Sequence, residues 1–569
     1  MSRARRNWTG QGTAFFVNAP AFLRSPPFPG IKPALAAISH VRQAGDAPVV
    51  VADAVLDAVA EARVGGSFWG HRPDGIRPDG IRLVARAGVA VPQEALEGLS
   101  SQEIGIVGFG RRGQGVAGRA LPSPVDPWAV VAGARSVHAA ADDELAIVAG
   151  LLGVPVFAPD LRPVAAEALR EAARSAVAAA RYRDCFTGEP VDALHAVAQL
   201  ADWRRHLDGN RGMAAASGMA FWKREAIRHF LWDGLCSPPF LSPQKGLRRA
   251  VRQGGALAVW PSRVPPAAME EAREQGVTIA KVEDGFLRSR GLGAALHPPG
   301  SVVVDRSGIY YDARFPSDME KLLATHGFTP ALERRAARLR AMIRASGVTK
   351  YGKDEGRMID LPQGRRTVLA VGQVEDDLSV EYGGAGVTGN LDLLKRVRAA
   401  EPDAFIVYRP HPDVQAGLRK GHLSDAAVLD QADAIDTGSP LMPLVQAVDE
   451  VHVLSSLTGF EALMRDRPVT VHGMPFYAGW GLTRDLAPAN GRRGRFLTLD
   501  QLVAGALILY PRYLDPVTRL PCGPEIMVER LAGGAPSSMS WPVSWLIRLR
   551  TLQGKLQRFM TLSAEYFHG

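Results

Sequence analysis

The stretch Arg366-Thr-Val-Leu-Ala-Val-Gly-Gln-Val-Glu-Asp-Asp377 joins a short run of apolar residues to a polar turn directly behind it. The apolar run predicts a β-strand that is buried on both faces. Similar runs recur at residues 256–260, 277–282, 301–305, 405–408 and 451–454. Helical patterns fall between them, at residues 316–325, 331–345, 391–400 and 459–465. Alternating strands and helices predict an α/β fold in which helices cover parallel sheets on both faces.

Two such sheets are expected, parted near residues 352–365, where charged, Gly- and Pro-containing sequence interrupts the pattern. Residues 1–207 differ from both, since they are rich in alanine and have few polar motifs behind their strands. We predict four parts: residues 1–207, two lobes at 208–360 and 361–535, and a tail at 536–569.

A weak internal repeat links the first part to the third. Val137-His138, followed by Val154-Pro-Val-Phe157, parallels Val451-His452, followed by Arg467-Pro-Val-Thr470. This similarity favours a duplicated sheet domain whose first copy has lost its small polar residues, with chance similarity as the alternative. The same region contains Gly-x-Gly-x-x-Gly at residues 108–113. Because no acidic residue follows at the spacing that a dinucleotide site requires, a plain glycine-rich turn is the favoured interpretation.

Composition limits the class of protein. The chain has 569 residues, 46% of them hydrophobic, which excludes disordered and fibrous proteins. Its three cysteines predict a reducing compartment and exclude a disulfide framework or a zinc cluster. No run approaches the roughly 18–20 apolar residues of a membrane span, and no apolar segment of a secretory signal follows the basic start. The net charge of +9 favours anionic partners.

Four polar clusters follow predicted strands in the second half of the chain. The first contains adjacent carboxylates, Glu283 and Asp284, and then Arg288 and Arg290. Neighbouring side chains of a strand point to opposite faces, so only one of the two carboxylates is expected to face a given cleft. The arginines are placed to bind an anion. A solvated turn is the alternative interpretation of the acidic pair.

The other three clusters lie behind strands of the second sheet. Gln373 and Glu375 follow the first of these strands, and His411 lies between two prolines just after Arg409. Ser455 and Ser456 precede a helix that contains Glu461. Hydroxyls and free N–H groups at a helix start suit a phosphate, although serine there is also a common N-cap and His411 is equally suited to a structural role. Together, an acid, an imidazole and a phosphate-type helix start favour sugar transfer from a nucleotide.

These motifs resemble one known family. Val282–Gly293, Gly308–Ala313, Gly372–Asp377, Tyr408–Val414, Ser455–Leu463 and Pro475–Thr483 are similar, in order and spacing, to the capsule polysaccharide β-Kdo transferases of the KpsC/LipB type. The resemblance runs from about residue 220 to 533. Members of that family typically carry two modules, whereas this chain resembles one complete module behind a degenerate partial one.

The resemblance implies a GT-B-like pair of Rossmann-type lobes and CMP-β-Kdo as the donor. It implies that residues 208–360 form the acceptor-side lobe and residues 361–535 the nucleotide-binding lobe, behind a degenerate module at 1–207. It implies an acceptor built on lysophosphatidylglycerol and work at the inner face of the cytoplasmic membrane, beside other capsule assembly proteins. The family is regarded as retaining, so Asp284, with Glu283 beside it, is the expected nucleophile. If the enzyme inverted, Asp284 would be the general base.

The resemblance also suggests roles for the remaining polar residues. His411, Ser455 and Ser456 are expected at the CMP phosphate and Glu461 at the cytidine ribose. Gln373 and Glu375 are expected to contact the nucleotide or the sugar, while Arg288, Arg290 and Arg409 pair with the sugar carboxylate or the phosphate. No metal, cofactor or nucleic acid is expected. The alternatives are a transferase for another CMP-nonulosonate, such as sialic acid, and a non-catalytic scaffold of capsule export.

Residues 541–560 carry apolar side chains at helical spacing, interleaved with four basic residues. This pattern predicts an amphipathic helix on an anionic membrane, with a helix docked on protein as the alternative. We therefore expect a cytoplasmic protein that is peripheral at the inner membrane.

Overall fold

The computed structural model describes residues 21–42, 49–73, 80–108, 117–287, 298–348 and 356–533. They form two compact units: one runs to Arg204, and the other comprises Phe28–Ile31 and everything from Arg205 onward. The tail at 541–560, Arg288, Arg290 and most of the glycine motif at 108–113 lie outside the described residues. Within the described part of the chain, no helix is long and apolar enough to cross a membrane.

The N-terminal unit is built on a parallel five-stranded sheet with strand order β4-β3-β2-β5-β6. The strands are β2 (Leu83–Arg86), β3 (Ile104–Val107), β4 (Arg119–Leu121), β5 (Ser136–His138) and β6 (Val156–Phe157). The main helices are α2 (Asp53–Ala62), α4 (Pro127–Val131), α5 (Glu144–Leu152) and α6 (Ala166–Ala178), with the short α1 (Pro33–Ala36) and α3 (Gln93–Leu96). A small antiparallel sheet joins β1 (Ser39–Val41), β7 (Ala180–Arg183) and β8 (Pro190–Val191), and α7 (Ala193–Asp208) follows it.

The second unit contains two lobes. The first lobe holds a six-stranded sheet with strand order β20-β19-β12-β11-β10-β9. Its strands are β9 (Met213–Ser217), β10 (Ala256–Val259), β11 (Ile279–Asp284), β12 (Ser301–Asp305), β19 (Arg512–Leu514) and β20 (Pro521–Cys522). Its helices are η1 (Phe221–Lys223), α8 (Arg224–Phe230), α9 (Pro243–Gln253), η2 (Pro261–Arg263), α10 (Pro266–Glu274), α11 (Asp318–Thr325) and α12 (Pro330–Ser346).

This first sheet corrects the expectation of purely parallel pairing. Strands β9, β10 and β11 are parallel, but β12 runs antiparallel to β11, and β19 and β20 continue the antiparallel pattern. An antiparallel neighbour needs no crossover helix. The apolar run at 301–305 does not indicate in which direction its strand runs. The C-terminal segment therefore returns to complete the sheet of the first lobe.

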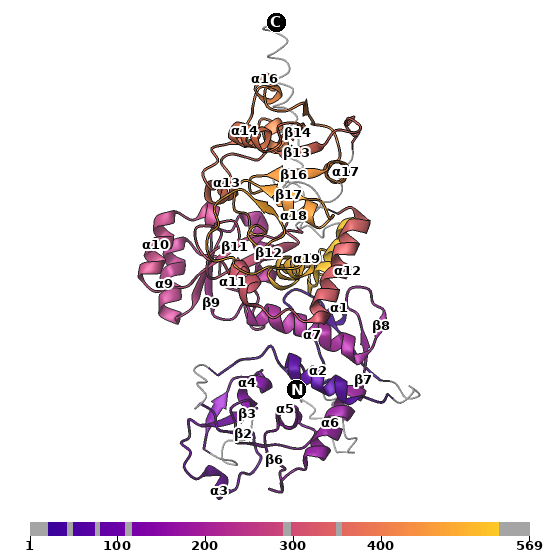
Figure 1. The fold of residues 1–569 in the computed structure, drawn as a ribbon. Helices are drawn as coiled ribbons and strands as arrows, with labels where there is room; N and C mark the ends of the chain where they lie inside the picture. The colour runs from indigo at the N-terminus through magenta and orange to yellow at the C-terminus, as the bar shows by residue number, and fades with distance from the viewer. Residues whose placement is uncertain are drawn as a thin grey trace, which may run out of the picture. The chain divides into compact units, whose positions relative to one another are not determined.

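The second lobe holds a fully parallel sheet with strand order β15-β14-β13-β16-β17-β18 (Figure 1). Its strands are β13 (Thr367–Val371), β14 (Phe405–Arg409), β15 (Ala434–Ile435), β16 (Glu450–Val453), β17 (Val469–Val471) and β18 (Arg484–Asp485). Its helices are α13 (Leu378–Gly383), α14 (Asn390–Ala400), α15 (Pro412–Gln415), α16 (Asp425–Leu429), α17 (Leu441–Ala447) and α18 (Leu457–Leu463). Helix α19 (Leu499–Val503), the π-helix η4 (Ala504–Leu509) and α20 (Pro524–Gly533) complete the chain.

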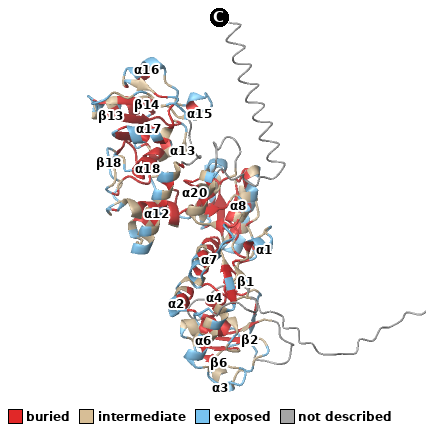
Figure 2. Ribbon diagram, turned by 90° about the vertical axis from the view of Figure 1, so that its right-hand side faces the viewer, coloured by how far each residue is buried: buried red, intermediate tan, exposed pale blue. Residues whose placement is uncertain are grey.

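Strand β13 shows why this region folds as predicted. All five of its residues are buried, and the central strands appear in red in Figure 2. Val368 and Ala370 pack in one hydrophobic cluster and Leu369 and Val371 in another, so both faces of the strand are covered. The α/β fold is confirmed, with a fully parallel sheet in the second lobe and a mixed sheet in the first.

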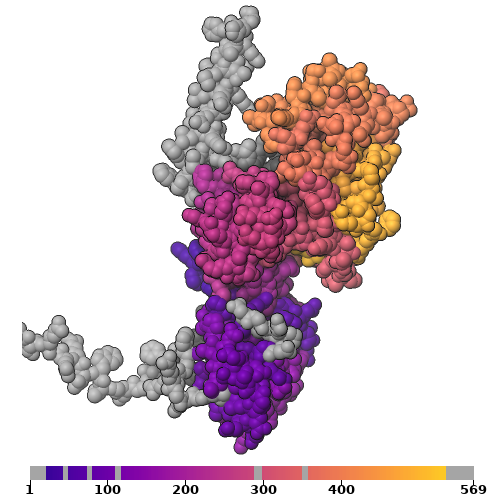
Figure 3. Space-filling model, turned by 90° about the vertical axis from the view of Figure 1, so that its left-hand side faces the viewer, coloured from indigo at the N-terminus to yellow at the C-terminus, as the bar shows by residue number. Residues whose placement is uncertain are grey.

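The two lobes share one hydrophobic core. Phe286, just behind β11, lies 4.7 Å from the Phe476 ring, and Phe476 lies 5.3 Å from Phe460 of α18 (centroid distances). Helix α12 contacts both α19 and η4, and the salmon and yellow residues of these segments adjoin in the space-filling view of Figure 3. Aromatic pairs at these distances add roughly 0.5–1.5 kcal/mol each beyond their buried area. The shared core fixes the position of the ends of the two sheets relative to each other.

Candidate functional site

Asp284 ends β11, where a site in an open α/β sheet is expected. Its Oδ1 accepts a hydrogen bond from Lys223 Nζ at 3.0 Å, and the lysine side chain is itself buried. The ammonium lies 3.5 Å from the centroid of the Trp260 ring. The candidate nucleophile is therefore an ion-paired carboxylate at the end of a rigid strand.

Glu283 has a different environment. Its Oε1 accepts a hydrogen bond from the backbone N–H of Asp284 at 3.0 Å. Burial raises the pKa of Tyr310 and Tyr311 well above the usual range, and the negative charges of Glu283 and of Asp377 in the second lobe add to the rise. Both phenols consequently remain protonated, and acidic groups from both lobes act on the same pair of tyrosines.

Gln373 and Ser455 form a reciprocal pair behind β13 and β16. The backbone N–H of Ser455 donates to Gln373 Oε1 at 2.8 Å, and Gln373 Nε2 donates to Ser455 Oγ at 3.1 Å. Gln373 N–H in turn donates to Asn390 Oδ1 at 2.8 Å. Gln373 thus fixes the position of the Ser455 hydroxyl.

Ser456 is the N-cap of α18. Its Oγ accepts from the backbone N–H of Thr458 at 3.2 Å and donates to Thr458 Oγ1 at 3.1 Å. The phenol of Tyr477 donates to the Ser456 carbonyl. The capping role weighed for this serine is therefore present, and phosphate binding by its side chain stays a prediction.

Glu375 is tied to the start of α14. Its Oε1 accepts from the backbone N–H of Asn390 at 2.8 Å. Gly389 between them has φ +147°, and a Cβ there would collide with Glu375 Oε1, so glycine is required. This bond gives Glu375 a role in helix capping, and its contact with a donor remains a prediction.

His411 lies at the end of β14 and caps α15. Its Nδ1 accepts from the backbone N–H of Asp413 at 3.1 Å, so a neutral ring carries its proton on Nε2. Nε2–H is then the atom suited to donate to a phosphate oxygen.

Arg409 and Glu461 are both integrated into the second lobe. The Arg409 guanidinium pairs with Asp436 and donates to the Ser439 carbonyl at 2.6 Å, and burial leaves only 15% of its side chain exposed. This is a structural arrangement that the motif did not reveal. Glu461 is buried in α18, 7% exposed.

Gly383 marks the place where the acid-bearing and serine-bearing segments approach one another. A Cβ on Gly383 would lie 3.4 Å from the Tyr311 carbonyl oxygen of the first lobe and 3.5 Å from Ser455 Cβ of the second. One residue along, the guanidinium of Arg314 lies 3.7 Å from the centroid of the Tyr382 ring. The predicted phosphate end and the Glu283–Tyr311 region thus meet at one point.

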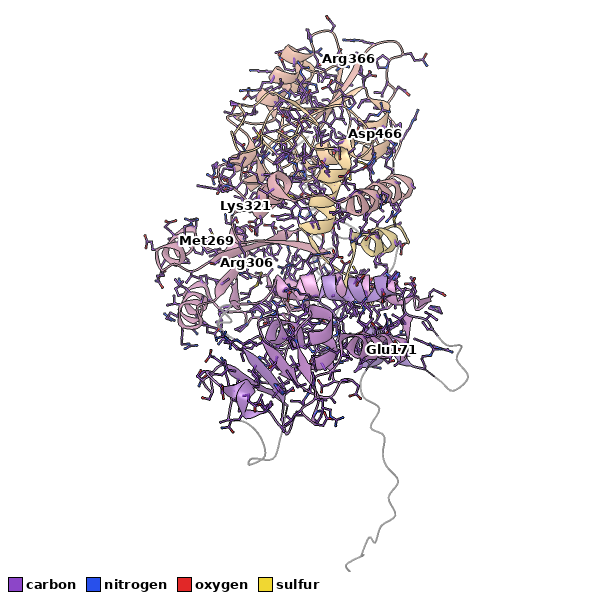
Figure 4. The ribbon with its side chains drawn as sticks, turned by 60° about the horizontal axis from the view of Figure 1, so that its bottom comes forward. Glu171, Met269, Arg306, Lys321, Arg366 and Asp466 are labelled. Carbon is purple, nitrogen blue, oxygen red and sulfur yellow. The ribbon has the colours of Figure 1, made fainter. Side chains whose placement is uncertain are left out.

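One group of the described residues has the composition of a metal site. Ligand atoms of Glu401, Glu450 and His452 lie within 4.8 Å of one another. Arg366, labelled in Figure 4, pairs with both glutamates, and Arg484 lies 3.4 Å from Glu401 Oε1. These guanidinium groups already balance the two carboxylates, so the group does not favour a divalent cation.

Sequence reasoning missed Lys223, Tyr310, Tyr311 and Asn390 as site residues. Lys223 has no motif around it and meets Asp284 only in the folded chain. The Gly308–Ala313 motif contained both tyrosines, but without an indication of their contact with the acids. Asn390 follows Gly389 at a helix start, which is the one local signal for it.

Comparisons with known proteins agree with these motifs. The family model described as "Capsule polysaccharide biosynthesis protein" matches residues 255–346 and 339–513. The capsule polysaccharide modification protein LipA of Neisseria meningitidis serogroup A is 38% identical over 351 residues, which cover 62% of this chain and 50% of LipA. The lipopolysaccharide-processing protein LpsZ of Rhizobium meliloti is 44% identical over 262 residues, covering 45% of this chain and 59% of LpsZ. The chain thus spans about half the length of the curated relatives it matches.

Two solved structures of Thermosulfurimonas dismutans KpsC are also similar to the chain. Its beta Kdo 2,4 transferase is 34% identical, with 57% of this chain and 100% of that chain covered and a TM-score of 0.49. Its beta Kdo 2,7 transferase is 33% identical, with 57% and 99% covered and a TM-score of 0.47. The chain belongs to the capsule polysaccharide biosynthesis proteins of the KpsC/LipB type.

Proposed function

We propose that the chain is a glycosyltransferase that moves Kdo from CMP-β-Kdo to a β-Kdo glycolipid acceptor. The observation that carries this proposal is the meeting of two segments at Gly383. A first-lobe segment at Tyr311, beside the Glu283 carboxylate, approaches Ser455 at the start of a second-lobe helix. Helix starts and fixed hydroxyls favour a phosphate, and a carboxylate at a strand end suits attack on an anomeric carbon.

Transfer with retention proceeds in two substitutions. In the first, an Asp284 oxygen bonds to the anomeric carbon, the bond from that carbon to the phosphate oxygen breaks, and CMP leaves with the electron pair. In the second, an acceptor hydroxyl oxygen bonds to the carbon and Asp284 leaves as a carboxylate. The hydroxyl proton passes to bulk water.

The second lobe binds the leaving nucleotide. Ser455, held by Gln373, and the Nε2–H of His411 donate to the phosphate, and Glu461 contacts the ribose. Arg288 and Arg290 are assigned to the sugar carboxylate on the basis of the family resemblance. Arg409 acts through Asp436, by supporting the turn behind β15.

The acceptor places the reaction at a membrane. We propose a β-Kdo linker on lysophosphatidylglycerol and a peripheral location at the inner face of the cytoplasmic membrane, from the family resemblance and the basic pattern at 541–560. The N-terminal unit has no catalytic part in this proposal.

The test is a transfer reaction with purified chain, CMP-Kdo generated in situ and a synthetic β-Kdo lipid acceptor. Mass spectrometry should show the acceptor gaining one Kdo unit. CMP-sialic acid at the same concentration should give product at a rate at least about tenfold lower, because the site must distinguish two nonulosonates. If CMP-sialic acid were used in preference, it would be the donor in place of CMP-Kdo. Absence of transfer from either donor, together with no binding of CMP in calorimetry, would favour an export scaffold.

A further inference from the structure

Lys223 is a buried cation in contact with the candidate nucleophile. It ends η1, directly before α8, and is 7% exposed. Its Nζ lies 3.0 Å from Asp284 Oδ1, 3.5 Å from the centroid of Trp260 and 5.2 Å from the centroid of Trp222. The ammonium is thus held between a carboxylate and two aromatic faces.

Stability alone is a poor explanation for this arrangement. Burying the ammonium is costly because it loses its hydration, while the Asp284 side chain keeps 19% of its surface exposed. A buried ion pair is often no more stabilising than apolar residues of the same volume. The cation–π contact with Trp260 recovers only part of this cost. An apolar side chain beside two tryptophans would pack as well, so the charge itself points to a chemical use.

The contacts fix the orientation of the carboxylate. Lys223 holds Oδ1, the Asp284 N–H is bound to Glu283 Oε1, and β11 is paired with β10 and β12 on either side. Trp260 is anchored in turn, because its backbone N–H donates to the Ser217 carbonyl at 3.1 Å. A carboxylate held through one oxygen has a defined plane, and this sets the direction in which its other oxygen points.

We propose that Lys223 is a positioning residue for Asp284, an inference that rests on the proposed function. Its ammonium favours the ionised carboxylate before attack. When the sugar ester forms, the negative charge of Asp284 is lost while the ammonium stays buried beside it. In the second substitution the electron pair returns to Asp284, and the ammonium stabilises the charge as it reappears. Lys223 therefore accelerates the breakdown of the adduct in particular.

The test compares Lys223→Met with Lys223→Arg and with the control Lys245→Met, which removes an exposed lysine from α9. Each protein receives CMP-Kdo alone, then acceptor, and the intact mass is followed over time. We expect Lys223→Met to lower turnover by about 100-fold, as removal of a preorganised charge-stabilising group does. Its adduct should persist after acceptor is added, while Lys223→Arg recovers most of the turnover and Lys245→Met behaves as wild type.

Several outcomes would overturn the inference. Turnover of Lys223→Met within twofold of wild type would do so, and so would equal slowing of adduct formation and breakdown. If Lys223→Met does not give the wild-type circular dichroism spectrum, Lys223→Gln replaces it under the same criteria. An active wild type with these results would leave the proposed function intact, whereas a wild type without adduct or transfer would overturn both.

Discussion

The N-terminal sheet and the sheet of the second lobe follow the same course through space. In each sheet the first strand is central, the next two strands lie on one side of it and the following two on the other. In the N-terminal sheet, β3 and β4 lie on one side of β2, and β5 and β6 on the other. In the second lobe, β14 and β15 lie on one side of β13, and β16 and β17 on the other. Each sheet is followed by an antiparallel hairpin, β7–β8 or β19–β20, and then by a helix, α7 or α20. The shared order supports the predicted duplication.

The two sheets differ at the helix that follows the fourth strand in chain order. In the second lobe this helix, α18, begins with Ser455 and Ser456, and Gln373 holds the first of them. In the N-terminal unit α5 begins with Asp143, whose carboxylate caps the helix and takes two hydrogen bonds from Arg86, at 2.6 and 2.8 Å. The Asp143 carboxylate, paired with Arg86, repels a phosphate and occupies the position at which a phosphate would bind. The start of a helix can thus keep its N-cap and its fold while it no longer binds an anion.

The largest effect should come from Asp284, the carboxylate at the end of β11 in the first lobe. Asp284→Asn is expected to lower Kdo transfer by about 1000-fold or more, because an amide is a poor nucleophile and a poor leaving group. Product formation by mass spectrometry measures this. Asp143→Asn, at the N-cap of α5, should stay within twofold of wild type. A large loss from Asp143→Asn would show that the N-terminal unit takes part in catalysis.

The second effect concerns a histidine that both sheets contain, His138 on β5 and His452 on β16. Burial lowers the pKa of His138, and it lowers the pKa of His452 and of its neighbour His472 to about 4. Between about pH 4 and pH 6.5 the unfolded chain binds protons that the folded chain does not, so stability rises with pH across that window. Acidification from pH 7 to pH 4.5 should therefore lower the free energy of unfolding by a few kcal/mol.

Urea unfolding at a series of pH values measures this dependence. His452→Phe should reduce its slope between pH 4.5 and 6.5, and the control His422→Gln, at an exposed position, should not. An unchanged slope in His452→Phe would mean that this histidine is not the group responsible.

A third, smaller effect is expected at Ser455, directly before the N-cap of α18. Ser455→Ala removes one donor to the phosphate, and a hydrogen bond to a charged group is worth about 1.5–3 kcal/mol. CMP affinity by calorimetry should fall about 10- to 100-fold. Gln373→Ala should give a smaller loss, because the hydroxyl remains but is no longer held. If Gln373→Ala weakens binding more than Ser455→Ala, then Gln373 itself contacts the nucleotide.

The smallest effect should follow from placing a serine, as found at the start of α18, at the N-cap of α5. Asp143→Ser retains a cap for α5 but removes the pair with Arg86, which is partly exposed, at a cost of about 1 kcal/mol. Thermal unfolding of the N-terminal unit reports this change, and transfer should be unaltered. A new site for CMP in this variant would show that the ion pair alone had closed the start of α5.

Prediction from sequence succeeded where a local pattern determines the outcome. Apolar runs identified β13, β14 and β16, because a strand buried on both faces admits few polar residues. Partners could not be predicted, since they depend on segments brought together by folding: Lys223 meets Asp284 across 61 positions, and Gln373 meets Ser455 across 82. The pairing of Arg409 with Asp436 is of the same kind. Motifs revealed which side chains lie at strand ends, but not which of them are engaged by other protein groups.

The return of the chain to the first lobe affects how the protein is made. Strand β12 pairs with β19, and Arg512 of β19 donates to the Gly209 carbonyl at 3.0 Å from within a buried setting. When residues 205–348 leave the ribosome, strand β12 at one edge of their sheet has no partner. It stays unpaired until β19, which ends at residue 514, has been translated. At about 5–20 residues per second this interval lasts on the order of ten seconds or more. During it, β12 is an open template for a wrong strand, so the growing chain is most vulnerable to aggregation just before its last strands appear.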